Sequence, residues 1–208
     1  MRSVGIYVYD DVEVLDFAGP FEVFSTASRV FRRAQPDAEA PFAVFTVGAS
    51  RGPVTARGGL VVEPRYSFAD HPNLAVLLVP GGVVTAELGR PRVIAWVAAR
   101  AATAELTASV CTGAFLLARA GLLKGKSATT HWEDVADLRA AAPGARVVQG
   151  GRWVEDGAVI TSAGISAGLD MSLHIVARLA GHDLAARTAR QMDYQWRDEG
   201  QKAAAKAG

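Results

Sequence analysis

Short apolar runs alternate with longer segments of helical periodicity along most of this chain. Runs such as residues 74–79, almost wholly aliphatic, are typical of strands that are buried on both faces of a parallel sheet. Strands are predicted over residues 4–9, 42–47, 74–79, 106–110, 127–130, 146–148, 152–154 and 159–161. Helices are predicted over residues 20–31, 91–102, 114–120, 132–141, 166–180 and 183–196. This alternation predicts an α/β fold, a doubly wound and mostly parallel sheet with helices on both faces.

Turn and cap residues mark the ends of these elements. The pair Gly58 and Gly59 separates two short apolar stretches, which predicts a small β-hairpin excursion. Pro20 is expected in the first turn of the first helix, where its missing N–H costs nothing. Ser166 and Asp183 are expected to cap the last two helices.

Three polar features follow strand ends in this pattern. Asp16 follows the first predicted strand, Gly81 and Gly82 follow the third, and Cys111 follows the fourth. Ligands of such sheets bind outside the carboxyl ends of the strands. A carboxylic acid, a pair of free backbone amides and a thiol are therefore expected to converge on one crevice, which outlines a reaction site.

Cys111 is the single cysteine of the chain, and it stands where an apolar strand turns sharply into a helix. Such an elbow presents one side chain to a pocket, backed by the partly positive end of the helix. Gly113 lets the chain bend closely there, and Thr112 adds a hydroxyl beside the sulfur. Thr112 can donate a hydrogen bond through its hydroxyl, through its backbone amide, or through neither. The helix N-terminus is expected to lower the pKa of the thiol below its ordinary value of about 8.5. The position predicts a nucleophilic cysteine, and a packed, inert cysteine is the alternative.

The companion residues also have structural interpretations. Asp16 either handles protons beside the cysteine or only caps the first helix. His131, at a strand end, is either a base or a hydrogen-bonded residue of the pocket wall. Gly81 and Gly82 form a tight turn, a role that is compatible with an anion cradle. The sequence leaves these alternatives open because side-chain geometry decides between them.

Length and charge limit the classes of function. The 208 residues suit one domain, predicted over residues 1–197, and the Lys- and Ala-rich end over residues 198–208 is expected to fray. The formal net charge is +1, from 22 basic and 21 acidic side chains, so no nucleic-acid partner is expected. No apolar run approaches the ~20 residues of a membrane span, and the N-terminal stretch is too short for a signal peptide. A cytoplasmic protein with a reduced cysteine is expected.

No metal site or cofactor motif is recognisable in the sequence. The four histidines show no ligand spacing, and the single cysteine has no partner thiol. Glycine patterns that bind dinucleotides or nucleoside triphosphates are missing as well. The expected partner is a small-molecule substrate, with no cofactor.

Five segments resemble the ThiJ/PfpI superfamily, the flavodoxin-like relatives of class I glutamine amidotransferase domains. They are residues 11–20, 79–82, 109–125, 128–132 and 161–170. The resemblance extends over residues 4–196 and implies a flavodoxin-like fold. Within the superfamily, the chain looks most similar to isocyanide hydratases and to the ligand-sensing domains of AraC-type transcription regulators.

Two positions discriminate between branches of this superfamily. Protease-like and glyoxalase-like members generally have a histidine directly after the cysteine and a glutamate where Asp16 stands, whereas Thr112 follows the cysteine here. The combination of cysteine, threonine and aspartate is similar to that of isocyanide hydratases. The resemblance implies that Cys111 is the nucleophile, that Asp16 handles protons and that Thr112 assists. Peptidase activity is not expected.

The implied enzyme is a hydro-lyase that converts an isocyanide into an N-substituted formamide through a thioimidate on Cys111. The residues expected to bind the substrate, or the charge that develops on it, are Gly81, Gly82, Gly113, His131 and Ile165. Two other functions stay open: a ligand or redox sensor related to AraC-type regulators, and chemistry on α-oxoaldehydes. Only 27 residues follow Gly181, so no helix-turn-helix DNA reader is expected.

A homodimer is expected, since superfamily relatives are often homodimers. Phe21, Phe24 and Phe31 form an apolar side of the first predicted helix that suits such an interface. The same stripe can instead pack onto the sheet of its own chain.

Overall fold

The computed structural model describes residues 1–198 and 200–202. Within these residues, the main sheet has eight strands in the order β12-β10-β11-β7-β6-β1-β2-β5. The strands are β1 (Arg2–Tyr7), β2 (Phe42–Gly48), β5 (Tyr66–Ser67), β6 (Val76–Val79), β7 (Leu106–Val110), β10 (Trp153–Asp156), β11 (Val159–Ser162) and β12 (Gly200–Lys202). All neighbouring pairs are parallel except β10 and β11. The predicted mostly parallel α/β sheet is confirmed.

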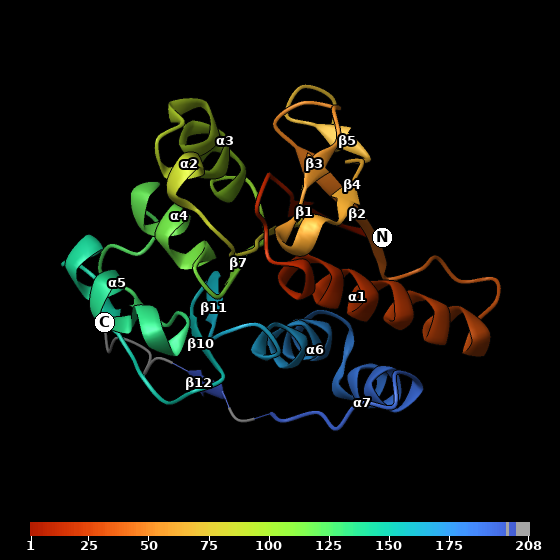
Figure 1. Ribbon diagram of the computed structural model, residues 1–208. Coiled ribbons are helices and arrows are strands. Elements are labelled where there is room, and N and C mark those ends of the chain that lie inside the picture. The colour runs from red at the N-terminus through yellow and green to blue at the C-terminus, as the bar shows by residue number, and fades with distance from the viewer. Residues whose placement is uncertain (199, 203–208) are drawn as a thin grey trace.

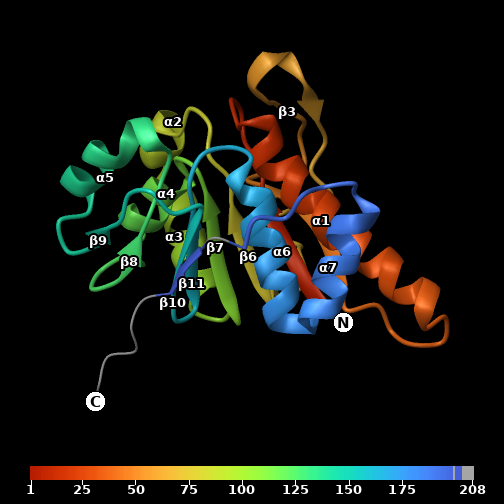
Figure 2. The same ribbon diagram turned by 90° about the horizontal axis from the view of Figure 1, so that it is seen from below.

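The helices form two groups, one on each face of the sheet (Figure 1). On one face, α1 (Val14–Ala34), α6 (Ala167–Ala180) and α7 (His182–Gln191) pack against one another, and Figure 2 shows them side by side. The other group comprises α2 (Thr85–Leu88), α3 (Pro91–Ala101), α4 (Gly113–Arg119) and α5 (Val135–Ala141). The sheet is therefore covered on both faces, as the alternation of strands and helices predicts.

Smaller elements complete the fold outside the main sheet. The predicted hairpin excursion is confirmed as β3 (Val54–Thr55) paired antiparallel with β4 (Val61–Val62), with the 3-10 helix η1 (Arg57–Gly59) between them. The strand predicted over residues 127–130 is shorter, β8 (Ser127–Ala128), and pairs with β9 (Arg146–Val147). The helix predicted over residues 132–141 begins as a 3-10 turn, η2 (Trp132–Asp134), before α5.

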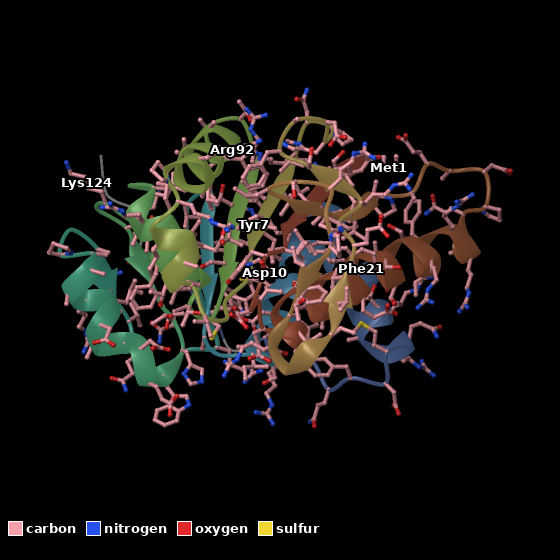
Figure 3. All side chains as sticks on the ribbon, turned by 45° about the horizontal axis from the view of Figure 1, so that its top comes forward. Met1, Tyr7, Asp10, Phe21, Arg92 and Lys124 are labelled. Carbon is pink, nitrogen blue, oxygen red and sulfur yellow. The ribbon has the colours of Figure 1, made fainter. Side chains whose placement is uncertain are left out.

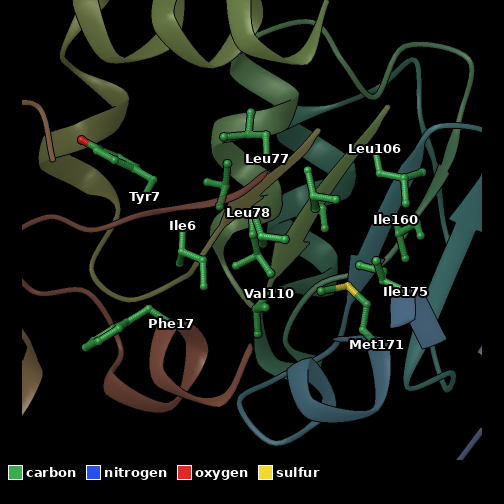
Figure 4. Packing of buried hydrophobic residues seen from close by; sticks show 14 of the residues in the cluster. Ile6, Tyr7, Phe17, Leu77, Leu78, Leu106, Val110, Ile160, Met171 and Ile175 are labelled. Carbon is green, nitrogen blue, oxygen red and sulfur yellow. The ribbon is translucent and has the colours of Figure 1, made fainter. Parts of the chain in front are cut away.

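The core consists of the aliphatic strand residues that the sequence pattern predicts. All residues of β6 and β7 are buried. Met171 and Ile175 of α6 lie beside Ile160 of β11, and Val110 ends β7 in the same region (Figure 4). Burial of one such side chain contributes about 1.5–3 kcal/mol. This packing fixes the strand end that carries Cys111.

Helix α1 begins at Val14 and not near Pro20. Asp16 and Pro20, one helical turn apart, are both buried, so the helix presents its inward face before the proline. Pro20 lies inside the helix and leaves the Asp16 carbonyl without its usual intrahelical N–H partner. Glu13 occupies the N-cap position. The interpretation of Asp16 as a helix cap is therefore wrong.

The two predicted caps of the last helices are also wrong. Ser166 stands at the N-cap position of α6 but makes no side-chain cap bond. Asp183 lies within the first turn of α7, whose N-cap position is occupied by Gly181. The hydroxyl of Ser166 instead accepts a hydrogen bond from the Arg152 guanidinium.

Helix α7 ends at Gln191 and does not continue to Trp196. Asp193 adopts a left-handed φ of 51°. The Tyr194 N–H bonds back to the Ala189 carbonyl at 2.9 Å, which is the usual pattern of a left-handed helix ending. An aspartate tolerates this conformation, so the helix stops without a glycine.

Part of the tail predicted to fray is a strand. Residues 200–202 form β12 and pair in parallel with β10. The prediction of fraying is therefore wrong for these three residues, and residues 199 and 203–208 lie outside the described part of the chain.

The apolar stripe of α1 packs largely within the fold. Phe24 is completely buried and meets Phe42 of β2 edge-on, with ring centroids 5.2 Å apart. Phe21 and Phe31 are partly buried against the same core. The homodimer stays a prediction, which gel filtration tests.

Most charged side chains lie at the periphery of the molecule, whereas Tyr7 lies in its middle (Figure 3). The buried acids Asp16, Glu87 and Asp170 are exceptions. Arg92 and Lys124 mark this outer layer in the figure. Among the helices that the structure describes, none combines the length and the apolarity of a membrane span.

Candidate active site

Cys111 occupies the elbow between β7 and α4, as predicted. Its φ of 55° lies in the left-handed region, a costly conformation that persists only where the surroundings enforce it. The Cys111 N–H faces the carbonyls of Ser162 and Ala163 at 3.2 and 3.3 Å. The Thr130 hydroxyl donates to the Cys111 carbonyl at 2.8 Å. These contacts hold the strained residue on both sides of its Cα.

The Asp16 carboxyl group is completely buried beside the Cys111 thiol. Its Oδ2 accepts a hydrogen bond of 3.0 Å from the Gly81 N–H, whereas Oδ1 has no conventional hydrogen-bond partner among the described residues. Burial raises the pKa of Asp16 from 3.8 to about 7, against smaller lowering effects of the Gly81 N–H and the Cys111 thiol. A buried carboxyl oxygen without a partner, next to a thiol, is suited to take a proton from the sulfur.

The ionisation of Cys111 differs from the prediction. Cys111 is only 8% exposed. Burial, and then the charge of Asp16, raise the pKa of the thiol from 9.0 to about 12. The backbone N–H groups of Thr112 and Ile165 face the sulfur and favour its anion, but desolvation outweighs them. The expectation of an easily ionised thiol is wrong, because Asp16 loses its proton first.

Gly81 and Gly82 do not provide the expected pair of free amides. The Gly81 N–H is bound to Asp16. The Gly82 N–H donates to Thr112 Oγ1 at 2.9 Å, and the Thr112 hydroxyl faces the Gly82 carbonyl at 2.9 Å. Gly82 has a φ of 134°, and a Cβ there would lie 2.2 Å from the Asp11 carbonyl oxygen, so the turn requires glycine. The Thr112 hydroxyl therefore braces this turn against the elbow.

Gly113 allows α4 to start directly against β6. The residue is buried, and a Cβ there would lie 2.1 Å from the Val79 carbonyl oxygen. The expected tight bend is confirmed, and the structure gives Gly113 a packing role beneath the elbow.

The Gly113→Ala variant is expected to be less stable by about 1–3 kcal/mol, the usual cost of overpacking. The added methyl group would clash with the Val79 carbonyl of β6, and neither this central strand nor the packed start of α4 can move far enough to relieve the clash. Gly89→Ala is the matched control, because a Cβ there meets nothing closer than 3.5 Å, and its effect should stay within about 0.5 kcal/mol. Urea denaturation of both variants measures the difference. Equal midpoints would contradict the close approach at Gly113.

A pocket of about 330 Å³ opens at the elbow. Its lining residues are Glu13, Arg57, Gly82, Cys111, Thr112, His131, Glu133, Asp134 and Ile165. The structure thus brings Cys111 together with four of its predicted companions, and Asp16 lies buried behind this lining. The volume is near the lower end of small-molecule sites, so the pocket suits a small substrate.

His131 belongs to the wall of this pocket. Its Nδ1 accepts a 3.3 Å hydrogen bond from the Glu133 N–H and lies 3.6 Å from the Asp134 carboxylate. These contacts hold the ring at the start of η2 and favour the wall interpretation over that of a base. Contact of His131 with a substrate stays a prediction.

Five residues at the site were not predicted from the sequence: Glu13, Arg57, Thr130, Glu133 and Asp134. Arg57 reaches the pocket from η1 and pairs with Glu13 at 3.2 Å, but nothing in a turn sequence indicates this role. Thr130 adjoins His131 in one of the five segments that resemble the superfamily. A polar side chain at a strand end could have been predicted to lie near the site. Its hydrogen bond to the Cys111 carbonyl depends on tertiary structure that the sequence pattern does not indicate.

A family model described as DJ-1/PfpI matches residues 2–178. The chain belongs to the DJ-1/PfpI family. This membership confirms the ThiJ/PfpI resemblance of the five sequence segments, which include the elbow and its neighbours.

Three similar proteins illustrate the breadth of the DJ-1/PfpI relatives. Isonitrile hydratase of Pseudomonas putida is 34% identical over 195 residues, which are 92% of this chain and 78% of that protein. The HTH-type transcriptional regulator GbdR of Pseudomonas aeruginosa is 28% identical over 93% of this chain and 51% of its own length. The crystal structure of a ThiJ/PfpI family protein from Pseudomonas syringae has a TM-score of 0.83 and 31% identity, covering 100% of this chain and 78% of that one.

Proposed function

We propose that this protein hydrates an isocyanide to an N-substituted formamide. The observation that carries the proposal is the buried Asp16 carboxyl group beside the Cys111 thiol at a small pocket. A second support is the 34% identity to isonitrile hydratase over 92% of this chain.

The first half of the reaction forms a carbon–sulfur bond. Between pH values of about 7 and about 12, the pair of Asp16 and Cys111 holds one proton, mainly on sulfur. Asp16 takes this proton as the sulfur attacks the terminal carbon of R–N≡C. Protonated Asp16 then delivers the proton to the same carbon, which gives the thioimidate Cys111–S–CH=N–R. The Thr112 and Ile165 N–H groups stabilise the sulfur while it carries negative charge.

The second half consumes one water molecule. Asp16, a carboxylate again, takes a proton from water as the oxygen adds to the thioimidate carbon, and passes that proton to the nitrogen. The carbon–sulfur bond then breaks, and the hydroxyl proton of the intermediate moves through Asp16 to the departing sulfur. The product is HC(=O)–NH–R, and the atoms of one isocyanide and one water account for it.

The pH dependence of kcat/KM is expected to follow the ionisation of Asp16. The rate should fall as the pH drops below about 7, because protonated Asp16 cannot accept the thiol proton. It should be level above that pH, since the one-proton state of the pair is then fully populated. Initial rates across a pH series measure this profile. A fall centred near the ordinary aspartate pKa of about 4 would contradict the effect of burial.

Ligand sensing is the second candidate function, because a transcriptional regulator is 28% identical over 93% of this chain. In that function the pocket binds a small molecule without turnover. A redox sensor is a variant of the same idea, and two oxygens added to Cys111 by mild peroxide would favour it. The buried, protonated thiol argues against rapid oxidation, since the thiolate is the reactive form.

A substrate screen separates these functions. Wild type and Cys111→Ala are each incubated with aryl and alkyl isocyanides, nitriles and 2-oxoaldehydes, and products are measured by chromatography. The proposal expects formamide from isocyanides with wild type only. Binding of these compounds without any product would support a sensor, and turnover of 2-oxoaldehydes alone would support α-oxoaldehyde chemistry.

A further inference from the structure

The segment of residues 161–170 contains a buried acid that the proposed reaction does not use. Asp170 of α6 is completely buried. It accepts hydrogen bonds from the Arg152 guanidinium, from the Tyr194 hydroxyl at 3.1 Å and from the Arg197 N–H at 2.8 Å. A buried carboxylate is costly unless it is fully partnered. These three donors together stabilise Asp170 in the core.

Arg152 also contacts both ends of residues 163–166. Its carbonyl accepts a hydrogen bond of 2.9 Å from the Ala163 N–H, and its Nη2 donates to Ser166 Oγ at 3.2 Å. The guanidinium is a rigid planar fork, so bonds to Asp170 and Ser166 together fix Ser166 relative to α6. This contact engages the hydroxyl predicted to cap the helix.

Between these two ends lies a strained residue of the pocket. Ile165 has a φ of 39°, a costly conformation for a β-branched side chain that persists only when its flanks are fixed. Its N–H faces the Cys111 sulfur. The carbonyls of Ser162 and Ala163, on the same stretch of chain, face the Cys111 N–H. The position of this stretch therefore decides how well the sulfur anion is stabilised.

We propose that Arg152 is a positioning residue for Cys111. Through Ala163 and Ser166 it holds residues 163–166 so that the Ile165 N–H meets the sulfur once the thiol proton has left. This role concerns the sulfur anion itself, so it does not depend on which substrate the pocket accepts.

Two variants weaken this contact by different routes. Arg152→Lys keeps a positive charge beside Asp170, but an ammonium group cannot reproduce the fork to Asp170 and Ser166. Ser166→Ala removes the other end of the contact, at an exposed side chain, and leaves the ion pair intact. The rate at which iodoacetamide alkylates Cys111 is measured across a pH series, by mass spectrometry of the peptide that contains Cys111.

Both variants are expected to be alkylated about tenfold more slowly than wild type at each pH below the thiol pKa, which corresponds to a thiolate about 1.4 kcal/mol less stable. The double variant is expected to show little further decrease, because both substitutions break the same contact. Alkylation needs no isocyanide. If wild type does not hydrate isocyanides but the variants are alkylated more slowly, the proposed function is refuted and the role of Arg152 is supported.

Tyr194→Phe is the matched control. It removes a different hydrogen bond to the same Asp170 oxygen and leaves residues 163–166 untouched. Its alkylation profile should match that of wild type even where its unfolding midpoint falls. Wild-type alkylation in both Arg152→Lys and Ser166→Ala would overturn the proposal. An equal slowing in Tyr194→Phe would also overturn it, since general loss of stability would then explain the effect.

Discussion

Replacement of Cys111 by alanine is expected to lower kcat/KM for a simple aryl isocyanide by at least about 10⁴-fold, the order of loss when a nucleophile is removed. No other group at the pocket base can form the carbon–sulfur bond of the thioimidate. The variant should fold as wild type does, because Cys111 is a small side chain with a small apolar volume to lose. Initial rates of formamide formation measure the loss.

The control for this variant is Cys111→Ser, which keeps a polar group of similar size at the elbow. A hydroxyl is far harder to ionise than a thiol, so this variant should be nearly as inactive. Unfolding midpoints of both variants, measured in urea, show whether the elbow survives. Wild-type turnover by Cys111→Ala would rule the covalent scheme out.

Replacement of Asp16 by asparagine is expected to have two effects of opposite sign. Activity should fall by about 10²- to 10⁴-fold, the usual contribution of a general acid and base. Stability above neutral pH should rise. Between the unfolded-state pKa near 3.8 and the native pKa of about 7, the unfolded state ionises while native Asp16 keeps its proton. Wild-type stability therefore falls as the pH rises through this range.

Ionisation of the buried Asp16 lowers the free energy of unfolding by at most about 4 kcal/mol, and this loss is complete above the native pKa. An asparagine at this position cannot ionise, and its side-chain oxygen can still accept from the Gly81 N–H. The Asp16→Asn variant should therefore match wild type at about pH 4 and exceed it at about pH 9. Urea unfolding at both pH values measures this.

Asp170→Asn provides the contrasting case for the stability effect. Asp170 is equally buried, but its carboxylate is paired with Arg152. Removal of one partner from a buried ion pair is destabilising, so this variant should lose stability. Opposite changes in stability at the two aspartates would distinguish a buried carboxyl group without a cationic partner, Asp16, from one held in an ion pair, Asp170. If Asp16→Asn is less stable than wild type at pH 9, the ionised Asp16 carboxylate does not destabilise the native state, and this explanation is wrong.

The central strands were predictable because a strand buried on both faces leaves a continuous aliphatic run. β6 and β7 show this directly, since every residue in them is buried. The start of α1 was not predictable in the same way. Asp16 is a polar residue on the buried face of that helix, and Pro20 is inside it. A local pattern places Asp16 before the helix and Pro20 in its first turn. Only tertiary partners, the Gly81 N–H and Cys111, make the buried carboxyl group possible.

The residues of the candidate site were largely predictable, but their ionisation was not. Strand ends placed Asp16, the Gly81–Gly82 turn and Cys111 at one edge of the sheet, and the structure brings them together. The expected low thiol pKa rested on the N–H groups at the helix terminus and left out the loss of water around the sulfur. Desolvation depends on packing from elements distant in sequence. Arg57 was not predicted as a site residue because it reaches the pocket from η1, an element that is distant from Cys111 in sequence.

The most direct test of the covalent scheme is the mass of the protein during turnover. Wild type is mixed with an aryl isocyanide, quenched in acid at short times and analysed by mass spectrometry. We predict an adduct that equals the protein plus one whole isocyanide, located on the peptide with Cys111 and lost as formamide appears. Formamide released without any adduct on Cys111, and at an unchanged rate by Cys111→Ala, would contradict the scheme.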